Sequence, residues 1–175
     1  MSYKMFFSGY GGQGVMLAGQ IVAQAAIYEN KETTFFPSYG PEMRGGTANC
    51  TVIVSDTPIS SPLISESDCV LALNLPSMLK FEPTLKPGGI LLINTSLIHQ
   101  EPKRDDITIH RVAANELATE LGNTLTVNMI MLGAFARTTG IVSEETLERV
   151  IHKTFIAKKA ELAELNLKAF RMWKP

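Results

Sequence analysis

Two glycine-rich segments contain the residue types that could bind a phosphate or another anion. In the first, GYGGQG, the residues Gly9, Gly11 and Gly14 fit the spacing G-x-G-x-x-G, and Gly12 is a further glycine. Glycines at this spacing allow a tight turn and let backbone N–H groups at the start of a helix face an anion. They can also serve only a tight turn and close packing, and the motif alone leaves both interpretations open.

The second segment is FFPSYGPEMRGGTANC, residues 35–50, in which prolines and glycines surround an acid and a base. The guanidinium of Arg44 offers a planar fork of donors that suits a phosphate or a carboxylate, and Glu42 could hold it in position. The same pair could instead be a solvated surface ion pair, which contributes little energy. Gly45 and Gly46 let the backbone pass close to another surface. So much backbone constraint in one loop favours a binding surface.

The elements that must position these segments alternate between strand and helix along much of the chain. Runs of β-branched and apolar residues predict strands over residues 4–8, 33–36, 47–55, 68–74, 90–94 and 107–112. Predicted helices follow the glycine turn, run from Pro76 to residues 86–89, and cover residues 115–122, 127–138, the segment after Ser143, and 160–173. This alternation predicts an α/β sandwich with a mainly parallel sheet and a helical C-terminus, in one domain over residues 1–175.

Capping residues and apolar spacing refine these helices. We expect Asn115 to cap one helix, Gly122 to end it, and Ser143 to cap the next. The helix after the glycine turn has one apolar face, formed by Ala18, Ile21, Val22 and Ala25. The last helix has an apolar stripe of Leu162, Leu165, Ala169, Met172 and Trp173. That stripe could pack in the core or dock on a partner chain.

A dinucleotide site is disfavoured. Such a site needs an acid at the end of the second strand to bind a ribose hydroxyl. Pro37 and Ser38 stand at that position, and Glu32 lies before the strand rather than after it. A nicotinamide or flavin dinucleotide is therefore not expected, whereas a phosphate-bearing ligand remains compatible with the glycine turn.

Composition excludes several classes of partner. The chain has 175 residues and a formal net charge of -1, so we expect neither nucleic acid nor an anionic membrane as partner. Its apolar stretches are too short to span a bilayer, and its N-terminus lacks the apolar core of a secretory signal, which predicts a cytoplasmic protein. Two separated cysteines and three isolated histidines make a metal or iron–sulfur site on this chain alone improbable.

Several further residues have two possible roles. Asn74 could face the switch point of the sheet or form a local turn after a strand. Asn128 could cap a helix or donate across a subunit contact, and a structural role is favoured. His110 is expected to be a satisfied side chain rather than a catalyst. Cys50 is expected to be a small core residue rather than a nucleophile.

The two glycine-rich segments, together with SDTPISSP (residues 55–62), NMIMLGAFA (128–136) and NLKAF (166–170), resemble the gamma subunits of 2-oxoacid:ferredoxin oxidoreductases. The resemblance implies a Rossmann-like three-layer domain in a complex that converts a 2-oxoacid to its acyl-CoA. It implies that thiamine diphosphate and magnesium are held by alpha and beta subunits. It also implies that iron–sulfur clusters belong to the beta or a delta subunit, and that ferredoxin accepts the electrons. The segment GPEMRGGTANC is more similar to subunits acting with 2-oxoglutarate or branched-chain oxoacids than to those acting with pyruvate.

The resemblance also implies a site that covers the active site of the complex and contacts coenzyme A. Its candidate residues are Gly9, Gly11, Gly12, Gly14, Tyr39, Glu42, Arg44, Gly45 and Gly46. This prediction requires the two glycine-rich bends, and hence Gly11 and Arg44, to lie on one rim of the fold. The alternative is a stand-alone Rossmann-type module that binds a nucleotide or coenzyme A. The isolated chain could self-associate through surfaces that normally meet its partners.

Overall fold

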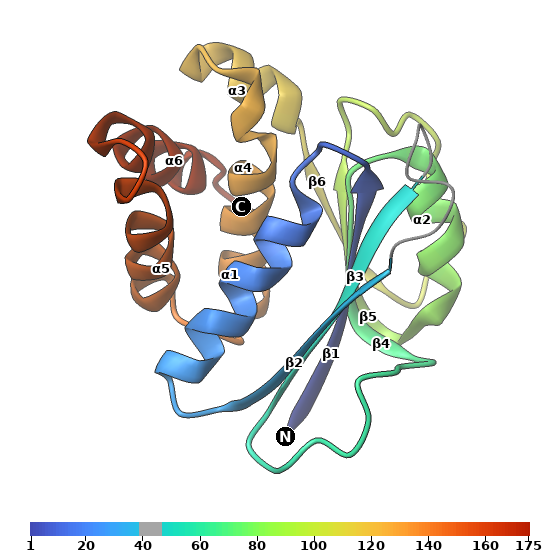
Figure 1. Cartoon of the computed structure of the whole chain (residues 1–175). Coiled ribbons are helices and arrows are strands. Elements are labelled where there is room, and N and C mark those ends of the chain that lie inside the picture. Colours follow the sequence, from blue (N-terminus) through green and yellow to red (C-terminus); the bar gives the residue numbers. More distant parts are fainter. Residues whose placement is uncertain (39–46) are drawn as a thin grey trace.

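The computed structural model describes residues 1–38 and 47–175, and its centre is a twisted six-stranded sheet (Figure 1). The strands lie in the order β2-β3-β1-β4-β5-β6. Their bounds are β1 Ser2–Tyr10, β2 Glu32–Ser38, β3 Thr47–Ser55, β4 Ser67–Ala72, β5 Leu85–Asn94 and β6 Thr108–Val112. The predicted strands are confirmed.

Most of the strands run in one direction. β4 pairs in parallel with β1 and β5, and β5 with β6, whereas β3 is antiparallel to both of its neighbours β1 and β2. Only β3 is therefore reversed among these strands, and the prediction of a mainly parallel sheet is confirmed. The ends of β1, β2, β4, β5 and β6 meet at one side of the sheet together with the start of β3, and we call this side the carboxyl edge.

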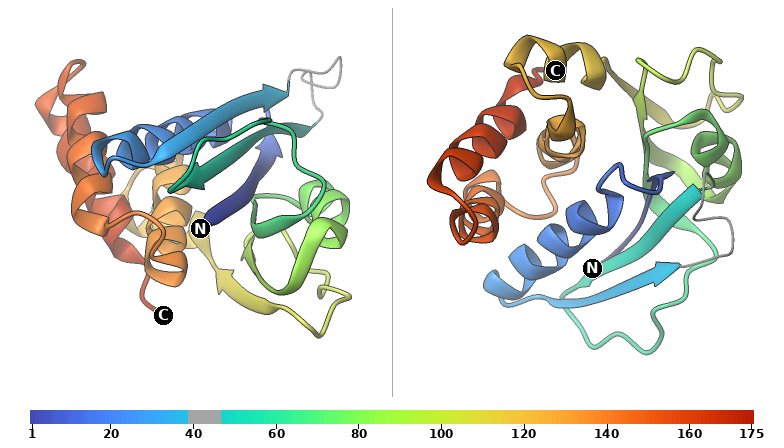
Figure 2. Two further views of the ribbon diagram at one scale, coloured as in Figure 1. Left: turned by 90° about the horizontal axis from the view of Figure 1, so that it is seen from below. Right: turned by 45° about the horizontal axis from the view of Figure 1, so that its top comes forward.

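Helices cover both faces of the sheet, which gives the expected three-layer α/β arrangement (Figures 1 and 2). One face is covered by the short helix α2, Leu75–Phe81, and the 3₁₀ turn η2, Glu82–Thr84. On the other side of the sheet lie α1, Val15–Tyr28, α3, Ala114–Leu121, the 3₁₀ turn η3, Thr124–Thr126, α4, Val127–Thr139, α5, Glu144–Ile156, and α6, Ala160–Met172. Of these, α1 packs on β2 and β3. Helices α5 and α6 pack on each other, α5 also packs on α1, and α6 also packs on α4.

Two apolar clusters explain why the central strands are apolar on both faces. In β1, Met5 and Phe7 belong to the cluster under α1 and α4, while Phe6 belongs to the cluster under α2. The same alternation occurs in β4, where Leu71 faces the first cluster and Val70 the second. A strand buried on both sides has no polar face, so its sequence reads as a continuous apolar run.

Helix α1 lies unusually close to strand β3. A Cβ atom on Gly19 would stand 2.5 Å from the Sγ atom of Cys50, so only glycine lets the helix approach this far. Cys50 is fully buried, and burial raises the pKa of its thiol to about 12. Cys50 is therefore a packed core residue, as expected, and not a nucleophile.

Two predicted details of the helices are wrong. Asn115 is not an N-cap but the second residue of α3. The first N–H groups of α3 are instead capped from another element, since Ala114 N donates to Oδ1 of Asn94 and Asn115 N donates to Oγ of Ser96. Helix α2 ends at Phe81, before the expected residues 86–89, which form part of β5.

The apolar stripe of the last helix is partly buried. Ala169 and Trp173 are buried, whereas Leu162, Leu165 and Met172 are half-buried. Helix α6 also crosses α4 closely. A side chain at Gly133 would collide with the carbonyl oxygen of Phe170, and Arg137 Nη1 donates to the same oxygen at 2.9 Å.

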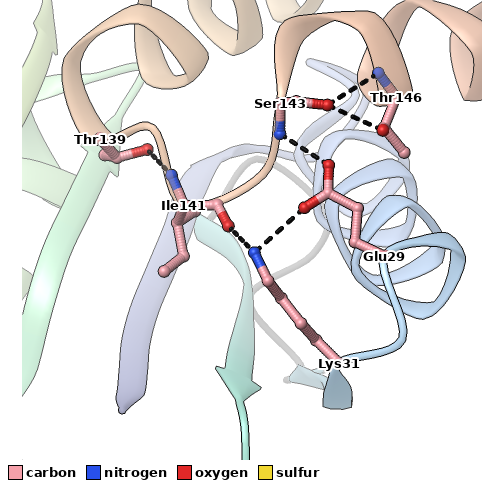
Figure 3. Close-up of polar contacts among 6 residues, drawn as sticks. All are labelled: Glu29, Lys31, Thr139, Ile141, Ser143 and Thr146. Atoms are coloured by element: carbon pink, nitrogen blue, oxygen red, sulfur yellow. Dashed lines mark hydrogen bonds and ion pairs between the residues drawn. The ribbon is translucent and has the colours of Figure 1, made fainter.

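A polar network ties the end of α1 to the start of α5 (Figure 3). One carboxylate oxygen of Glu29 accepts from the N–H of Ser143 at 2.9 Å, and the other accepts from Lys31 Nζ at 3.0 Å. Lys31 Nζ also donates to the carbonyl oxygen of Ile141 at 2.6 Å. Ser143 caps α5 through Thr146 N, so its expected capping role is confirmed. Burial opposes the charge on Glu29, but the hydrogen bonds from Ser143 and Lys31 outweigh it and lower the carboxyl pKa to about 2.

We predict that Glu29→Ala destabilises the protein by about 1 to 2 kcal/mol at pH 7, since it removes charge-assisted hydrogen bonds. The folded pKa lies below the unfolded value, so this contribution is present above about pH 4.5 and is lost as the pH falls towards 2. Urea unfolding of both proteins between pH 7 and pH 3 measures the difference. The exposed Glu120→Ala on α3 is the matched control, and a Glu29→Ala effect that does not shrink in acid would contradict the account.

Candidate functional site

The glycine turn joins the end of β1 to the start of α1 at the carboxyl edge (Figure 1). Gly12 has φ 89° and Gly14 has φ 77°, a left-handed conformation that side chains other than glycine rarely adopt. Gly14 is the N-cap residue of α1 and offers no side chain to bond the first N–H groups of the helix. Gly11 lies in the turn itself, and Gly9 lies in β1 opposite Ala48. The tight turn between strand and helix that the glycine spacing predicted is therefore present.

The interior of the turn is filled by one of its own side chains. The Oε1 atom of Gln13 accepts from the backbone N–H of Tyr10 at 2.6 Å and from Nδ2 of Asn74 at 3.4 Å. A Cβ atom on Gly9 would stand 2.6 Å from this oxygen, so Gly9 is needed to leave room for it. This hydrogen bond occupies the N–H of Tyr10, the last residue of β1. Sequence reasoning missed Gln13 because the sequence does not show which groups a glutamine inside a glycine motif will hydrogen-bond.

The connection between β2 and β3 begins and ends at the same edge of the sheet as this turn. Thr47, at the start of β3, pairs with Tyr10, and Ser38, at the end of β2, pairs with Asn49. Both ends of the connection between β2 and β3 therefore lie at the carboxyl edge. The predicted residues Tyr39, Glu42, Arg44, Gly45 and Gly46 lie outside the described residues. Their contacts with the glycine turn stay a prediction.

Two cavities border the turn. The larger has a volume of about 380 Å³ and is lined mainly by Tyr10, the turn glycines and the first residues of α1, among them Met16 and Leu17. The smaller has a volume of about 140 Å³ and lies between the turn, α3 and the start of α4. Its lining residues are Gly12, Gln13, Asn115, Thr124, Leu125 and Val127. None of these described lining residues is charged, which distinguishes the surface from a typical phosphate site.

Asparagine side chains connect the strand ends behind the turn. Asn74 caps α2, because its Oδ1 atom accepts from Ser77 N at 3.0 Å while its Nδ2 atom donates to Gln13. It therefore has both of the roles considered for it, the local turn and a place at the switch point of the sheet. Asn94 ends β5 and is fully buried, with hydrogen bonds to both α3 and the end of β4.

Asn128 has the structural role that was favoured. It is nearly buried on α4, and its Nδ2 atom donates to the carbonyl oxygen of Gly14 at 3.2 Å. A side chain on Gly14 would collide with this amide. His110 on β6 packs edge-on against Trp173, and burial lowers the pKa of its imidazole. It lies on an edge strand away from the glycine turn, consistent with a packing role.

Metal and membrane features are absent from the part of the chain that the structure describes. Within residues 1–38 and 47–175, no group of three or more His, Cys, Asp or Glu side chains could hold a metal ion. No helix in the same residues combines the length and the apolar character that crossing a bilayer requires.

The amino-acid sequence is similar to those of known proteins over nearly the whole chain. The family model described as pyruvate ferredoxin/flavodoxin oxidoreductase matches residues 4–172. The 2-oxoglutarate synthase subunit KorC of Methanocaldococcus jannaschii is 36% identical over 97% of this chain and 91% of its own length. The ketoisovalerate oxidoreductase subunit VorA of Methanothermobacter marburgensis is 37% identical over 94% of this chain, which corresponds to 34% of that longer subunit.

A solved structure has the same fold over nearly the whole chain. It is the gamma subunit of a keto/oxoacid ferredoxin oxidoreductase from Geobacter sulfurreducens, with a TM-score of 0.82 and 36% sequence identity. The alignment covers 97% of this chain and 95% of that one.

The two left-handed glycines of the turn give a matched pair of variants. We predict that Gly14→Ala destabilises the protein by about 2 to 3 kcal/mol, because backbone strain adds to a collision with Asn128. Gly12→Ala should cost only about 1 kcal/mol, since it has the same strain but no atom within 4 Å of the new Cβ. Thermal and urea unfolding measure both values. Equal losses in the two variants would show that Asn128 does not constrain the turn.

Proposed function

The chain belongs to the pyruvate ferredoxin/flavodoxin oxidoreductase family, as the gamma subunit of a 2-oxoacid:ferredoxin oxidoreductase, and we propose that its carboxyl edge helps to close the active site and to bind coenzyme A. The observation that carries the proposal is that the glycine turn and both ends of the segment 39–46 lie together at this edge. In this proposal the turn glycines and Tyr39, Glu42, Arg44, Gly45 and Gly46 form one surface towards the alpha and beta subunits.

The chemistry of the complex is proposed to reside on other chains. Thiamine diphosphate and magnesium would be held by alpha and beta subunits, and iron–sulfur clusters by a beta or delta subunit that passes electrons to ferredoxin. The two cysteines of this chain do not fit a cluster site, because Cys50 and Cys69 are both buried and burial raises the pKa of both thiols. A cluster requires accessible thiolates that converge on one point.

The proposed oxoacid is 2-oxoglutarate, and the proposed location of the complex is the cytoplasm. Support for the substrate comes from the KorC relatives, which are named as subunits of 2-oxoglutarate synthases. Other relatives are named for ketoisovalerate or pyruvate, so a comparison of these substrates on the purified complex tests this choice directly.

The isolated chain is expected to oxidise no 2-oxoacid and to bind no thiamine diphosphate. The complex formed with alpha and beta subunits should reduce ferredoxin in the presence of 2-oxoglutarate and coenzyme A. Calorimetry with thiamine diphosphate and a ferredoxin-reduction assay, each on the chain and on the complex, measure these two differences. Full activity of the chain alone would support the stand-alone module instead.

For the complex, we predict that Arg44→Ala raises the KM for coenzyme A roughly 10- to 100-fold. This range corresponds to the binding free energy lost with one charge-assisted hydrogen bond. The isolated variant should unfold at the wild-type temperature. Arg149→Ala is the matched control, because this arginine lies on α5 against the ring of Tyr28. Unchanged kinetics of the Arg44→Ala complex would remove Arg44 from the site.

A further inference from the structure

The smaller cavity at the carboxyl edge contains two amide groups whose orientation is fixed. Asn94 determines the first orientation, because its Oδ1 atom accepts from the backbone N–H groups of Ser96 and Ala114, both at 3.2 Å. Its Nδ2 atom must then point the other way, and it donates to Oδ1 of Asn115 at 2.8 Å. The oxygen of Asn115 therefore faces the protein, and its Nδ2 donor is turned away from Asn94.

The same reasoning orients Gln13. The backbone N–H of Tyr10 can only donate, so the atom of Gln13 at 2.6 Å from it is the oxygen. The Nδ2 atom of Asn74 approaches the same oxygen, and its own orientation is fixed by Ser77 N. The Nε2 donor of Gln13 is left on the other side. Among the described residues, neither this donor nor Nδ2 of Asn115 has a hydrogen-bond acceptor.

Gln13 and Asn115 line the same cavity of about 140 Å³, next to the apolar side chains of Leu125 and Val127. No charged residue lines it in the described chain, and the acidic residue Glu116 follows Asn115 in α3. The carboxylate of Glu116 accepts from Oγ of Ser96, the atom that also accepts from Asn115 N. Two neutral donors beside a carboxylate and an apolar wall favour a neutral carbonyl oxygen over a phosphate or a second carboxylate.

We propose that Gln13 and Asn115 form a two-donor subsite for carbonyl oxygens of a neutral, partly apolar chain, which we assign to the amide-bearing pantetheine arm of coenzyme A. This inference rests on the proposed function, because that function supplies the ligand. The arm combines two amide carbonyls with apolar methylene and methyl groups, which match the donors and the apolar wall. The phosphates of the same ligand then bind outside this cavity.

The chain offers variants that remove only the outward donors. In Asn115→Asp and Gln13→Glu, the inward oxygen can still accept from Asn94 or Tyr10, while the outward nitrogen becomes an oxygen. Asn115→Ala removes the donor without adding a charge. Gln100→Glu, in an exposed loop, adds the same charge away from the cavity and is the matched control.

Calorimetry on the assembled complex compares two probes. Desulfo-coenzyme A carries the pantetheine carbonyls, whereas adenosine 3′,5′-bisphosphate lacks them. We expect each of the three cavity variants to raise the Kd for desulfo-coenzyme A roughly 5- to 20-fold, as for one lost hydrogen bond, and to change the Kd for the bisphosphate less than about twofold. Gln100→Glu should change neither.

Two results would overturn the assignment. Unchanged desulfo-coenzyme A binding in Asn115→Ala and Gln13→Glu would show that the donors are not used, and an equal loss for both probes would show a general effect on the fold or the charge. Arg44→Ala separates this outcome from failure of the proposed function. If that variant weakens coenzyme A binding and the cavity variants do not, only the subsite is wrong. If none of them weakens it, both proposals fail.

Discussion

The hydrogen bond from the N–H of Tyr10 to the side-chain oxygen of Gln13 is the contact on which the carboxyl edge depends. It closes the glycine turn at the end of the central strand, requires Gly9 to leave space, and offers its second acceptor position to Asn74. Asn74 in turn begins α2 on the opposite face of the sheet. One amide oxygen therefore links the end of β1, the end of β4 and the start of a helix.

A glycine turn and the helix N-terminus behind it can hold an anion through their N–H groups. The residues that line the two cavities beside this turn are nevertheless uncharged. The carboxyl edge is thus rich in oriented amides rather than in cations. Such a surface discriminates by hydrogen-bond geometry and shape, and a cationic contribution to it would come from Arg44.

Local sequence predicted most of the fold because the signals are local. Apolar runs buried on two faces marked the central strands, Ser143 marked the start of α5, and Gly122 marked the end of α3. The error at Asn115 has a long-range cause. Asn115 is not a cap because Asn94 and Ser96, about 20 positions earlier in the chain, supply the cap. The crossing of α6 and α4 likewise depends on residues distant in sequence, since Gly133 leaves room for the backbone of Phe170.

The sequence by itself determined the α/β class, the glycine turn, the absence of a ribose-binding acid after the second strand, and the family. Periodicity, glycine spacing and motif order can be read from the linear sequence, so these features could be predicted without the structure. Only the tertiary structure decided that Gln13 fills the turn, that Asn94 orients Asn115, and that Gln13 and Asn115 line one cavity. An amide can point either way, and its direction is set by backbone donors that the fold brings to it from distant parts of the chain.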